Sequence, residues 1–291
     1  MSHQRRLEHS QNFIRNSNLV KELLELTQID HTDLVIEIGP GKGVITKELL
    51  KRAGRVIAIE RDPQFSENLL LLKKEGDLQL VISDFLKWQP PHNKFKVFSN
   101  IPFNYTADIV NKLVNSPESL PTDIYLIMQE AAAHRFIGAP NEQNSLISTL
   151  VAIDYTVKIL RKISRDNFDP KPNVTISFVH FSRRLKSPIP VNEKQFFRDF
   201  VVFGYTKWAP TVLESFNKVF TKRQRLIIAK SQKLNGLKPT DLSIEQWIEL
   251  YKGFSQYVDA GKKNLVYSSE ERLKKQQNKL EKSYRTRERM D

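Results

Sequence analysis

The sequence contains no cysteine and no long apolar run, and both absences restrict what the protein can do. Without cysteine the chain has no disulfides, no thiolate metal sites and no cysteine nucleophile. No apolar stretch approaches the roughly 20 residues that a helix needs to cross a bilayer. The first residues are basic, but the apolar segment of a secretory signal does not follow them. We therefore expect a cytoplasmic protein without a membrane-spanning helix.

Acidic residues are in short supply, with 33 Asp and Glu against 46 Lys and Arg, which gives a net charge of +13. Such an excess favours a polyanionic partner, nucleic acid before an anionic membrane. The basic helix with a bulky apolar face that membrane-surface binding requires is not seen. A basic, well-solvated surface without such a partner is the alternative. The hydrophobic content of 40% is sufficient for a folded core.

Strand-like and helical patterns alternate over the first half of the chain. Strand-like runs occupy residues 33–38, 55–60, 78–82, 95–99 and 124–128, and helical spacing occupies 18–29, 44–52, 63–75 and 106–114. This alternation is typical of βαβ units and predicts an α/β fold with a parallel sheet. Two more strand-like runs, 157–163 and 174–181, flank a loop whose two prolines exclude a central strand.

The pattern changes after residue 185. A Ser-Pro-Ile-Pro linker precedes helical patterns at residues 193–205, 211–220, 223–233 and 243–258, and from about residue 261 the chain is polar and mostly basic. We therefore predict an α/β domain over residues 1–185, a small all-helical domain over 190–260 and a basic tail over 261–291 that is disordered or conditionally helical.

Glycine-rich and polar residues follow four successive predicted strands. Residues 39–43 (GPGKG) follow the first strand, Glu60 ends the second, Asp84 follows the third and Asn100 ends the fourth. Because the carboxyl ends of parallel strands meet at the edge where open α/β sheets bind ligands, we expect these residues to lie together. Taken singly, each has an ordinary reading as a tight turn or a surface acid.

This set indicates a ligand that contains a nucleoside. The glycine spacing is G-x-G-x-G, which matches neither the dinucleotide fingerprint nor a phosphate-binding P-loop. Glu60 is placed to accept hydrogen bonds from ribose hydroxyls, and Asp84 from an adenine amino group. S-adenosylmethionine fits best, because it has a ribose and an adenine but no pyrophosphate. Asn100 and Phe103 offer an amide and a flat ring, which suit a flat target that bears an amine.

Together these motifs resemble those of the rRNA adenine N6-dimethyltransferases. The resemblance rests on residues 10–14 (SQNFI), 37–43 (EIGPGKG), Glu60, Asp84, 100–103 (NIPF) and 168–174 (FDPKPNV). It implies a Rossmann-like, class I S-adenosylmethionine-dependent methyltransferase fold. Residues 200–258 resemble the helical domain of the Erm branch, which acts on 23S rRNA and confers macrolide-lincosamide-streptogramin B resistance. The branch that dimethylates small-subunit rRNA shares most motifs and is the first alternative; a non-catalytic nucleic-acid-binding relative is the second.

The resemblance also implies a role for each motif residue. Cofactor contacts fall on Gln11, Asn12, Ile14, Gly39, Gly41, Glu60, Arg61, Asp84, Phe85 and Asn100. At the target base, Asn100 and the Ile101 carbonyl accept from the N6 amine, Phe103 stacks on the ring and Phe168 closes its other face. Many members have Tyr in place of Phe103, so stacking is kept here and a hydroxyl contact is lost. The implied partner is 23S rRNA or a precursor ribosomal particle, bound by a monomer.

The remaining polar and aromatic residues give weaker indications. Seven basic residues near the Phe168 segment are predicted phosphate contacts, with a solvated charged face as the alternative: Arg161, Lys162, Arg165, Lys171, Arg183, Arg184 and Lys186. The histidines have no metal-binding or catalytic spacing, so no metal site is expected. We expect Trp88, Trp208 and Trp247 to be buried or half-buried.

Overall fold

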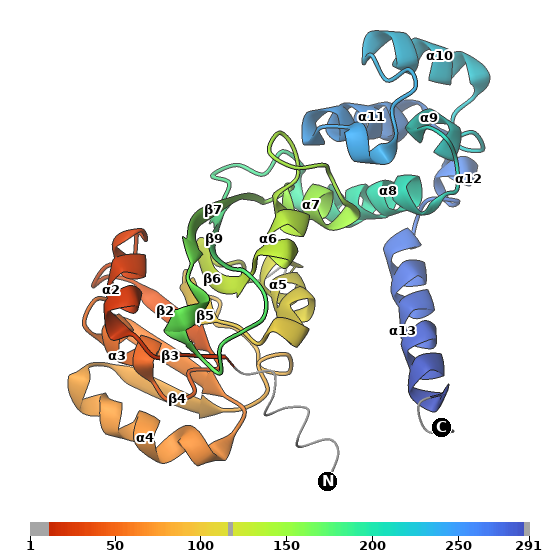
Figure 1. Cartoon of the computed structure of the whole chain (residues 1–291). Coiled ribbons are helices and arrows are strands. Elements are labelled where there is room, and N and C mark those ends of the chain that lie inside the picture. The colour runs from red at the N-terminus through yellow and green to blue at the C-terminus, as the bar shows by residue number, and fades with distance from the viewer. Residues whose placement is uncertain (1–11, 116–118, 288–291) are drawn as a thin grey trace. The chain divides into compact units, whose positions relative to one another are not determined.

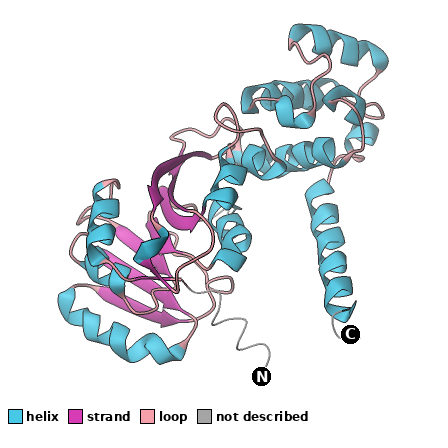
Figure 2. Cartoon of the chain, in the orientation of Figure 1, coloured by secondary structure: helices cyan, strands magenta, loops and turns pink. Residues whose placement is uncertain are grey.

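The computed structural model describes residues 12–115 and 119–287, which fall into two compact units. The α/β unit comprises Met1–Phe136 and Tyr155–Leu185, and the helical unit comprises Ile137–Asp154 and Lys186–Asp291. Strands occur only in the first of these units in the described part of the chain (Figure 2). Within the same residues, no helix has the length and apolarity needed to cross a membrane.

The α/β unit is built on a seven-stranded sheet in the order β4-β3-β2-β5-β6-β9-β7 (Figure 1). Its strands are β2 (Leu34–Ile38), β3 (Arg55–Glu60), β4 (Leu78–Ile82), β5 (Lys96–Asn100), β6 (Asp123–Gln129), β7 (Tyr155–Ile163) and β9 (Ile176–Arg183). Strands β2 to β6 are parallel, as predicted, and β9 is antiparallel to both β6 and β7. The strand order reverses between β2 and β5, and open α/β sheets bind ligands at such a reversal.

Among the described residues, five helices belong to this unit. They are α2 (Ser17–Glu25), α3 (Val44–Leu50), α4 (Ser66–Leu71), α5 (Thr106–Asn115) and α6 (Glu130–Ile137), with 3-10 turns η1 (Pro63–Phe65), η2 (Leu72–Glu75), η3 (Phe103–Tyr105) and η4 (Arg165–Asn167). Three of the helices, α3, α4 and α5, connect parallel strands. Residues 124–128 of β6 are completely buried, as expected for a central strand covered on both faces. A separate two-stranded ladder pairs β1 (Phe13–Ile14) with β8 (Phe168–Asp169).

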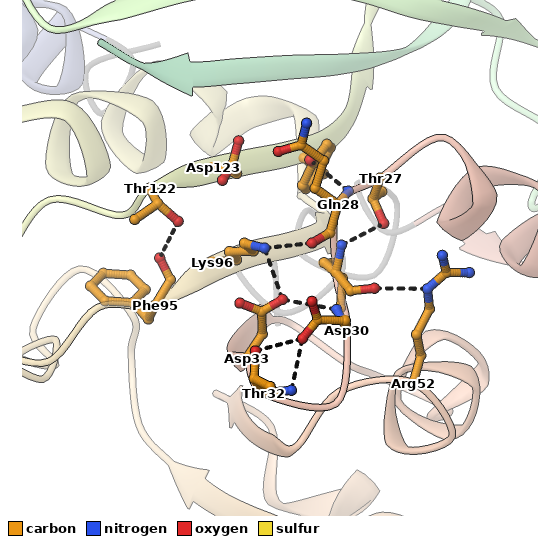
Figure 3. Close-up of polar contacts among 12 residues, drawn as sticks. Thr27, Gln28, Asp30, Thr32, Asp33, Arg52, Phe95, Lys96, Thr122 and Asp123 are labelled. Carbon is orange, nitrogen blue, oxygen red and sulfur yellow. Dashed lines mark hydrogen bonds and ion pairs between the residues drawn. The ribbon is translucent and has the colours of Figure 1, made fainter. Parts of the chain in front are cut away.

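Polar contacts close the edge of the sheet where the parallel strands begin (Figure 3). The Lys96 ammonium at the start of β5 donates to the Gln28 carbonyl and lies 2.8 Å from an Asp33 carboxylate oxygen. At the start of β6, Asp123 lies 2.8 Å from the His180 ring. These side chains are largely buried, so the pairing offsets the cost of their desolvation.

The helical unit is arranged around α8 (Lys194–Thr206). Its other elements are α7 (Leu146–Val151), η5 (Val191–Glu193), α9 (Val212–Ser215), α10 (Lys222–Ser231), η6 (Pro239–Asp241), α11 (Ile244–Tyr257), α12 (Ala260–Lys263) and α13 (Ser269–Arg287). Phe200 on α8 is fully buried, with its ring centroid 4.5 Å from Phe216 and 4.8 Å from Phe254. Position 204 of α8 must be glycine, because a Cβ on Gly204 would lie 2.6 Å from the Trp247 ring.

The units differ from the predicted domains at two places. Residues 137–154 belong to the helical unit, because Ile153 is buried in that unit's core. The basic tail, predicted to be disordered or conditionally helical, forms α12 and α13 as far as Arg287. The start of α13 is anchored by buried Asp199, which accepts from the backbone N–H groups of Ser268 and Glu270, and by Arg198, which donates twice to Glu270.

The tryptophans also depart from the prediction at one position. Trp247 is fully buried and Trp88 is half-buried, but the side chain of Trp208 is completely exposed. Trp208 lies in the irregular segment between α8 and α9, where no element covers its ring. The prediction for Trp208 is therefore wrong.

Candidate functional site

The glycine-rich turn between β2 and α3 has a left-handed backbone. Gly39 has φ +66° and Gly41 has φ +51°, a region that side chains with a Cβ rarely adopt. A Cβ on Gly41 would also lie 2.5 Å from the Phe13 ring, because the β1 segment passes over the turn. A Cβ on Gly39 would have no atom within 4 Å. The turn is therefore shaped so that backbone, rather than side chains, faces the sheet edge.

Glu60 ties this turn to the end of β3. Its carboxylate is 4% exposed and accepts hydrogen bonds from the backbone N–H groups of Gly41 (3.0 Å), Arg61 (2.8 Å) and Asp62 (2.8 Å). Two carboxylate oxygens offer about four acceptor positions, so a position remains for a hydroxyl of a ligand. The predicted ribose acceptor is thus held rigidly in place.

A cavity continues from Glu60 along the ends of β3 and β4. It is lined by Ile38, Gly39, Ile59, Glu60, Arg61, Ser83, Asp84, Phe85, Leu86, Pro102, Tyr105 and Ile109. Asp84 accepts from the Leu86 N–H through Oδ1 at 2.9 Å, and its Oδ2 has no hydrogen bond within the described residues. The structure therefore brings the predicted ribose and adenine contacts into one cavity.

Lys112 on α5 holds the loop that carries Asp84 and Phe85. Its ammonium donates to the carbonyls of Phe85 (2.7 Å), Leu86 (2.9 Å) and Trp88, and lies 5.2 Å from the Phe85 ring centroid. Burial lowers the pKa of Lys112, and the negative charge of Asp84 opposes that shift. Sequence reasoning missed this residue; the available signal was a lysine within the apolar pattern of residues 106–114.

A second cavity lies on the other side of Glu60. It is lined by Asn12, Phe13, Gly39, Gly41, Glu60, Asn100, Ile101, Pro102 and Phe103. The Asn100 Nδ2 group donates to the Asn12 carbonyl at 2.7 Å, whereas Asn100 Oδ1 is buried and has no partner among the described residues. A buried acceptor left unsatisfied costs about 1–3 kcal/mol, and this one lines a cavity that a ligand can enter.

The next residues shape the rim of this second cavity. Ile101 is 2% exposed, and its N–H donates to the Ile127 carbonyl on β6 at 3.3 Å. Phe103 is half-buried, and its carbonyl accepts from the Thr106 hydroxyl at 3.0 Å. The backbone after β5 is therefore fixed by neighbouring elements, and Phe103 lines the cavity.

Phe168 occupies a different position from the other predicted base contacts. Its ring is 1% exposed within the core of the α/β unit, and it does not line the cavity beside Asn100. Through β8 it pairs with Ile14 of β1, which keeps Asn12 and Phe13 over the glycine turn. A role against the base stays a prediction that requires the ring to leave the core. Gln11 lies outside the described residues.

Glu37 belongs to the glycine-rich motif, but the sequence predicted no role for it. It is 1% exposed in β2, and its Oε2 has no hydrogen-bond partner among the described residues. Burial raises the pKa of Glu37 to about 8; the nearby Thr46 hydroxyl opposes this rise and the charge of Glu60 adds to it. A glutamate inside the otherwise apolar run LVIEI was the available signal.

Three of the seven predicted phosphate contacts are engaged with carboxylates. Arg161 pairs with Glu22, Lys162 with Glu130 and Lys171 with Asp166. Exposed pairs of this kind contribute about 0–1 kcal/mol, so a phosphate can compete for the cations. Among the residues placed by the structure, no three His, Asp or Glu side chains gather as a metal site would require.

Comparison with known proteins agrees with this arrangement. The family model for ribosomal RNA adenine dimethylase matches residues 2–256. An rRNA adenine N-6-methyltransferase of Limosilactobacillus reuteri is 32% identical over 255 residues, which cover 86% of this chain and 97% of the relative. A ribosomal RNA small subunit methyltransferase A of Mycoplasma mycoides is 25% identical over 271 residues, which cover 90% and 97%.

The fold is also that of solved methyltransferases. The crystal structure of the 23S rRNA methyltransferase ErmE superimposes with a TM-score of 0.74 at 22% identity, over 84% of this chain and all of that one. The expected class I methyltransferase sheet with a helical C-terminal part is therefore confirmed. With the family model and the Limosilactobacillus relative, this shows that the chain belongs to the ribosomal RNA adenine dimethylase family and is an S-adenosylmethionine-dependent rRNA adenine N6-methyltransferase.

Proposed function

We propose that this enzyme methylates N6 of an adenine in 23S rRNA and thereby confers resistance to macrolide, lincosamide and streptogramin B antibiotics. The observation that carries the adenine part is the buried, unpartnered Asn100 Oδ1 beside a cavity. The choice of 23S rRNA rests on the resemblance of residues 200–258 to the Erm helical domain. In this proposal residues 1–185 bind the cofactor and the target base, and residues 190–260 contact RNA.

The residues at the sheet edge fit S-adenosylmethionine. Gly41 leaves space that a Cβ would fill, Glu60 keeps an acceptor position for a ribose hydroxyl, and Asp84 Oδ2 is available for an adenine amino group. When bound, the cofactor supplies an electrophilic methyl group on a sulfonium. The protein's own task is then to position the acceptor nitrogen.

The proposed mechanism needs no strong general base. An adenine amine is a poor nucleophile, because its lone pair is conjugated with the ring. Asn100 Oδ1 and the Ile101 carbonyl accept from its two N–H bonds, which favours a pyramidal nitrogen and frees the lone pair for the methyl group. The product loses its proton afterwards. Catalysis then comes from orientation and from preorganised acceptors.

The target base has to leave its stack to reach this cavity. Extruding a base costs a few kcal/mol, and stacking on an aromatic ring returns ~1–3 kcal/mol. Phe103 presents its ring at the cavity rim and is the proposed platform. The enzyme acts on 23S rRNA or a precursor particle, as a cytoplasmic monomer.

Expression in an erythromycin-sensitive host tests the proposal. We expect growth on erythromycin, and a primer-extension stop at one adenine of 23S rRNA. The Asn100→Ala variant, produced at the same level, is the matched control and is expected to give neither. Dimethylation of small-subunit rRNA without resistance would instead assign the enzyme to the branch of the Mycoplasma relative. RNA binding without any methyl transfer would assign it to the non-catalytic alternative, against which the complete acceptor set argues.

A further inference from the structure

The helical unit contains a hollow that the proposed chemistry does not use. Its volume is about 640 Å³, within the ~300–1,000 Å³ of typical ligand sites. It lies at the end of α8, along α9 and at α10, which Figure 1 labels. The side chains that matter for its chemistry are Lys207, Trp208, Glu214, Lys218 and Arg225. We call this site the Trp208 hollow.

Trp208 gives the hollow an exposed aromatic face. Its side chain is 106% exposed relative to the reference state, whereas the other large aromatic residues nearby, Phe203 and Phe216, are buried. An indole ring is one of the largest apolar surfaces a side chain can offer, and leaving it in water forfeits its burial energy. The next residues, Ala209 and Pro210, also line the hollow and add no polar group from their side chains.

The cations of the hollow lack acidic partners. Lys207 lies 4.8 Å from the Phe203 ring centroid, and neither it, Lys218 nor Arg225 forms an ion pair with any carboxylate in the described residues. Arg225 is half-buried, and its buried Nε has no hydrogen-bond partner among those residues. Glu214 is the one acidic side chain in the lining, so the formal charge of the hollow is positive.

We propose that the Trp208 hollow binds an unpaired nucleotide of the RNA substrate. The base stacks on Trp208, and its phosphate lies at Arg225, with Lys207 and Lys218 adding charge. An aromatic platform beside cations is the usual way in which proteins hold single-stranded nucleic acid. A guanidinium with an unpartnered N–H matches the two oxygens of a phosphate. The inference rests on the proposed function in taking RNA as the substrate, and adds an anchoring site in the helical unit.

RNA affinity of the full chain tests the hollow directly. The probe is a fluorescein-labelled single-stranded RNA of about 12 nucleotides, measured by anisotropy at several salt concentrations. We expect Trp208→Ala to weaken binding about 5- to 150-fold, the loss of one stacked base, and Trp208→Phe to keep most of the affinity. Arg225→Ala should lower the slope of log affinity against log salt by ~0.7, the loss of one phosphate contact on a single strand.

A control variant separates the hollow from general charge effects. Lys252→Ala removes an exposed cation of α11 that pairs with Glu249 and does not line the hollow, so it should bind the probe like the wild type. Affinity for S-adenosylmethionine and the melting temperature report whether each variant is folded. If Trp208→Ala fails to fold, the test uses three other variants instead: Trp208→Phe, Arg225→Ala and Lys218→Ala.

The outcomes distinguish this inference from the proposed function. Wild-type affinity and salt slope in Trp208→Ala and Arg225→Ala would overturn the hollow, while 23S rRNA methylation by the wild type would still stand. Loss of affinity in Trp208→Ala with an unchanged salt slope in Arg225→Ala would show that no phosphate lies at Arg225 and would overturn the site as proposed. Absence of methylation by the wild type would overturn the proposed function, whatever the hollow binds.

Discussion

The two edges of the parallel sheet treat buried polar groups in opposite ways. Where the strands begin, Lys96 is satisfied by Asp33 and by a carbonyl, and Asp123 by His180. Where they end, Glu37 Oε2 and Asn100 Oδ1 are buried without partners in the described structure. Each unsatisfied group costs stability, and Asn100 Oδ1 lines a cavity in which a ligand can supply the missing donor. The edge where the strands begin therefore stabilises the sheet, whereas the edge where they end keeps a polar group available for a ligand.

Removing the Asn100 acceptor at the edge where the strands end should have the largest effect on activity. In Asn100→Ala we expect methyl transfer to fall about 10²- to 10³-fold, the usual cost of one preorganised polar contact in a transition state. The free energy of unfolding should fall by only about 1 kcal/mol, because the one hydrogen bond lost is that from Asn100 Nδ2 to the Asn12 carbonyl. Tritium transfer to rRNA measures the first, and urea unfolding the second. Exposed Asn104→Ala is the matched control; wild-type transfer in Asn100→Ala would remove this residue from the mechanism.

Filling the glycine turn should have the next largest effect. In Gly41→Ala the added Cβ meets the Phe13 ring and the backbone is strained at φ +51°, so we expect affinity for S-adenosylmethionine to fall about tenfold or more. Isothermal titration calorimetry gives the affinity. Gly236→Ala has the same type of strain, with φ +74°, but open space around the Cβ, and should leave cofactor binding intact. Equal losses in the two variants would show that strain alone is responsible.

Removing a polar contact at the edge where the strands begin should affect stability and not cofactor binding. Lys96→Met removes the ammonium that donates to the Gln28 carbonyl and pairs with the Asp33 carboxylate, which keeps only the Asp30 N–H as a donor. We expect the free energy of unfolding to fall by about 1–3 kcal/mol, the cost of unpaired polar groups. Urea unfolding measures the loss, and calorimetry should give wild-type cofactor affinity for the folded variant. A large loss of affinity without destabilisation would contradict the division between the two edges.

The last expected effect concerns Glu37 and is confined to the pH dependence of stability. Burial raises its pKa from 4.5 to about 8, so the folded state favours the protonated form. The stabilising contribution is complete below pH 4.5 and is lost as the pH rises through 8. In Glu37→Gln this decline should be absent, so the difference between the two urea-unfolding curves should change between pH 5 and 8. A constant difference would show that Glu37 does not titrate in that range.

Local patterns predicted the parts of the fold that depend on one strand or helix. β3 and β4 have the predicted bounds, because short apolar runs between polar ends are what buried parallel strands require. α6 was not predicted, since it continues directly from β6 at Glu130 without a turn signal. The predicted helix over residues 211–220 is helical only at Val212–Ser215, because the Phe216 ring packs against Phe200 and Phe203.

The candidate site was predictable in outline and less so in detail. The order of strand ends indicated that Gly39, Glu60, Asp84 and Asn100 meet at one edge, and the structure brings them to two adjoining cavities. Side-chain exposure was not predictable, because it depends on segments distant in sequence. Only the fold shows how Lys112 holds the loop that carries Asp84 and Phe85.

One hydrogen bond has a consequence for which nucleobases the proposed enzyme accepts. The NH2 end of the Asn100 amide is committed to the Asn12 carbonyl, so the amide cannot turn over to present a donor to the cavity. In the proposed function a target must then bring hydrogens, as an adenine does at position 6. Hypoxanthine or guanine would bring a carbonyl oxygen to face another oxygen. The orientation of the Asn100 amide, which the Asn12 carbonyl holds, would thus determine the discrimination between an amino and an oxo purine.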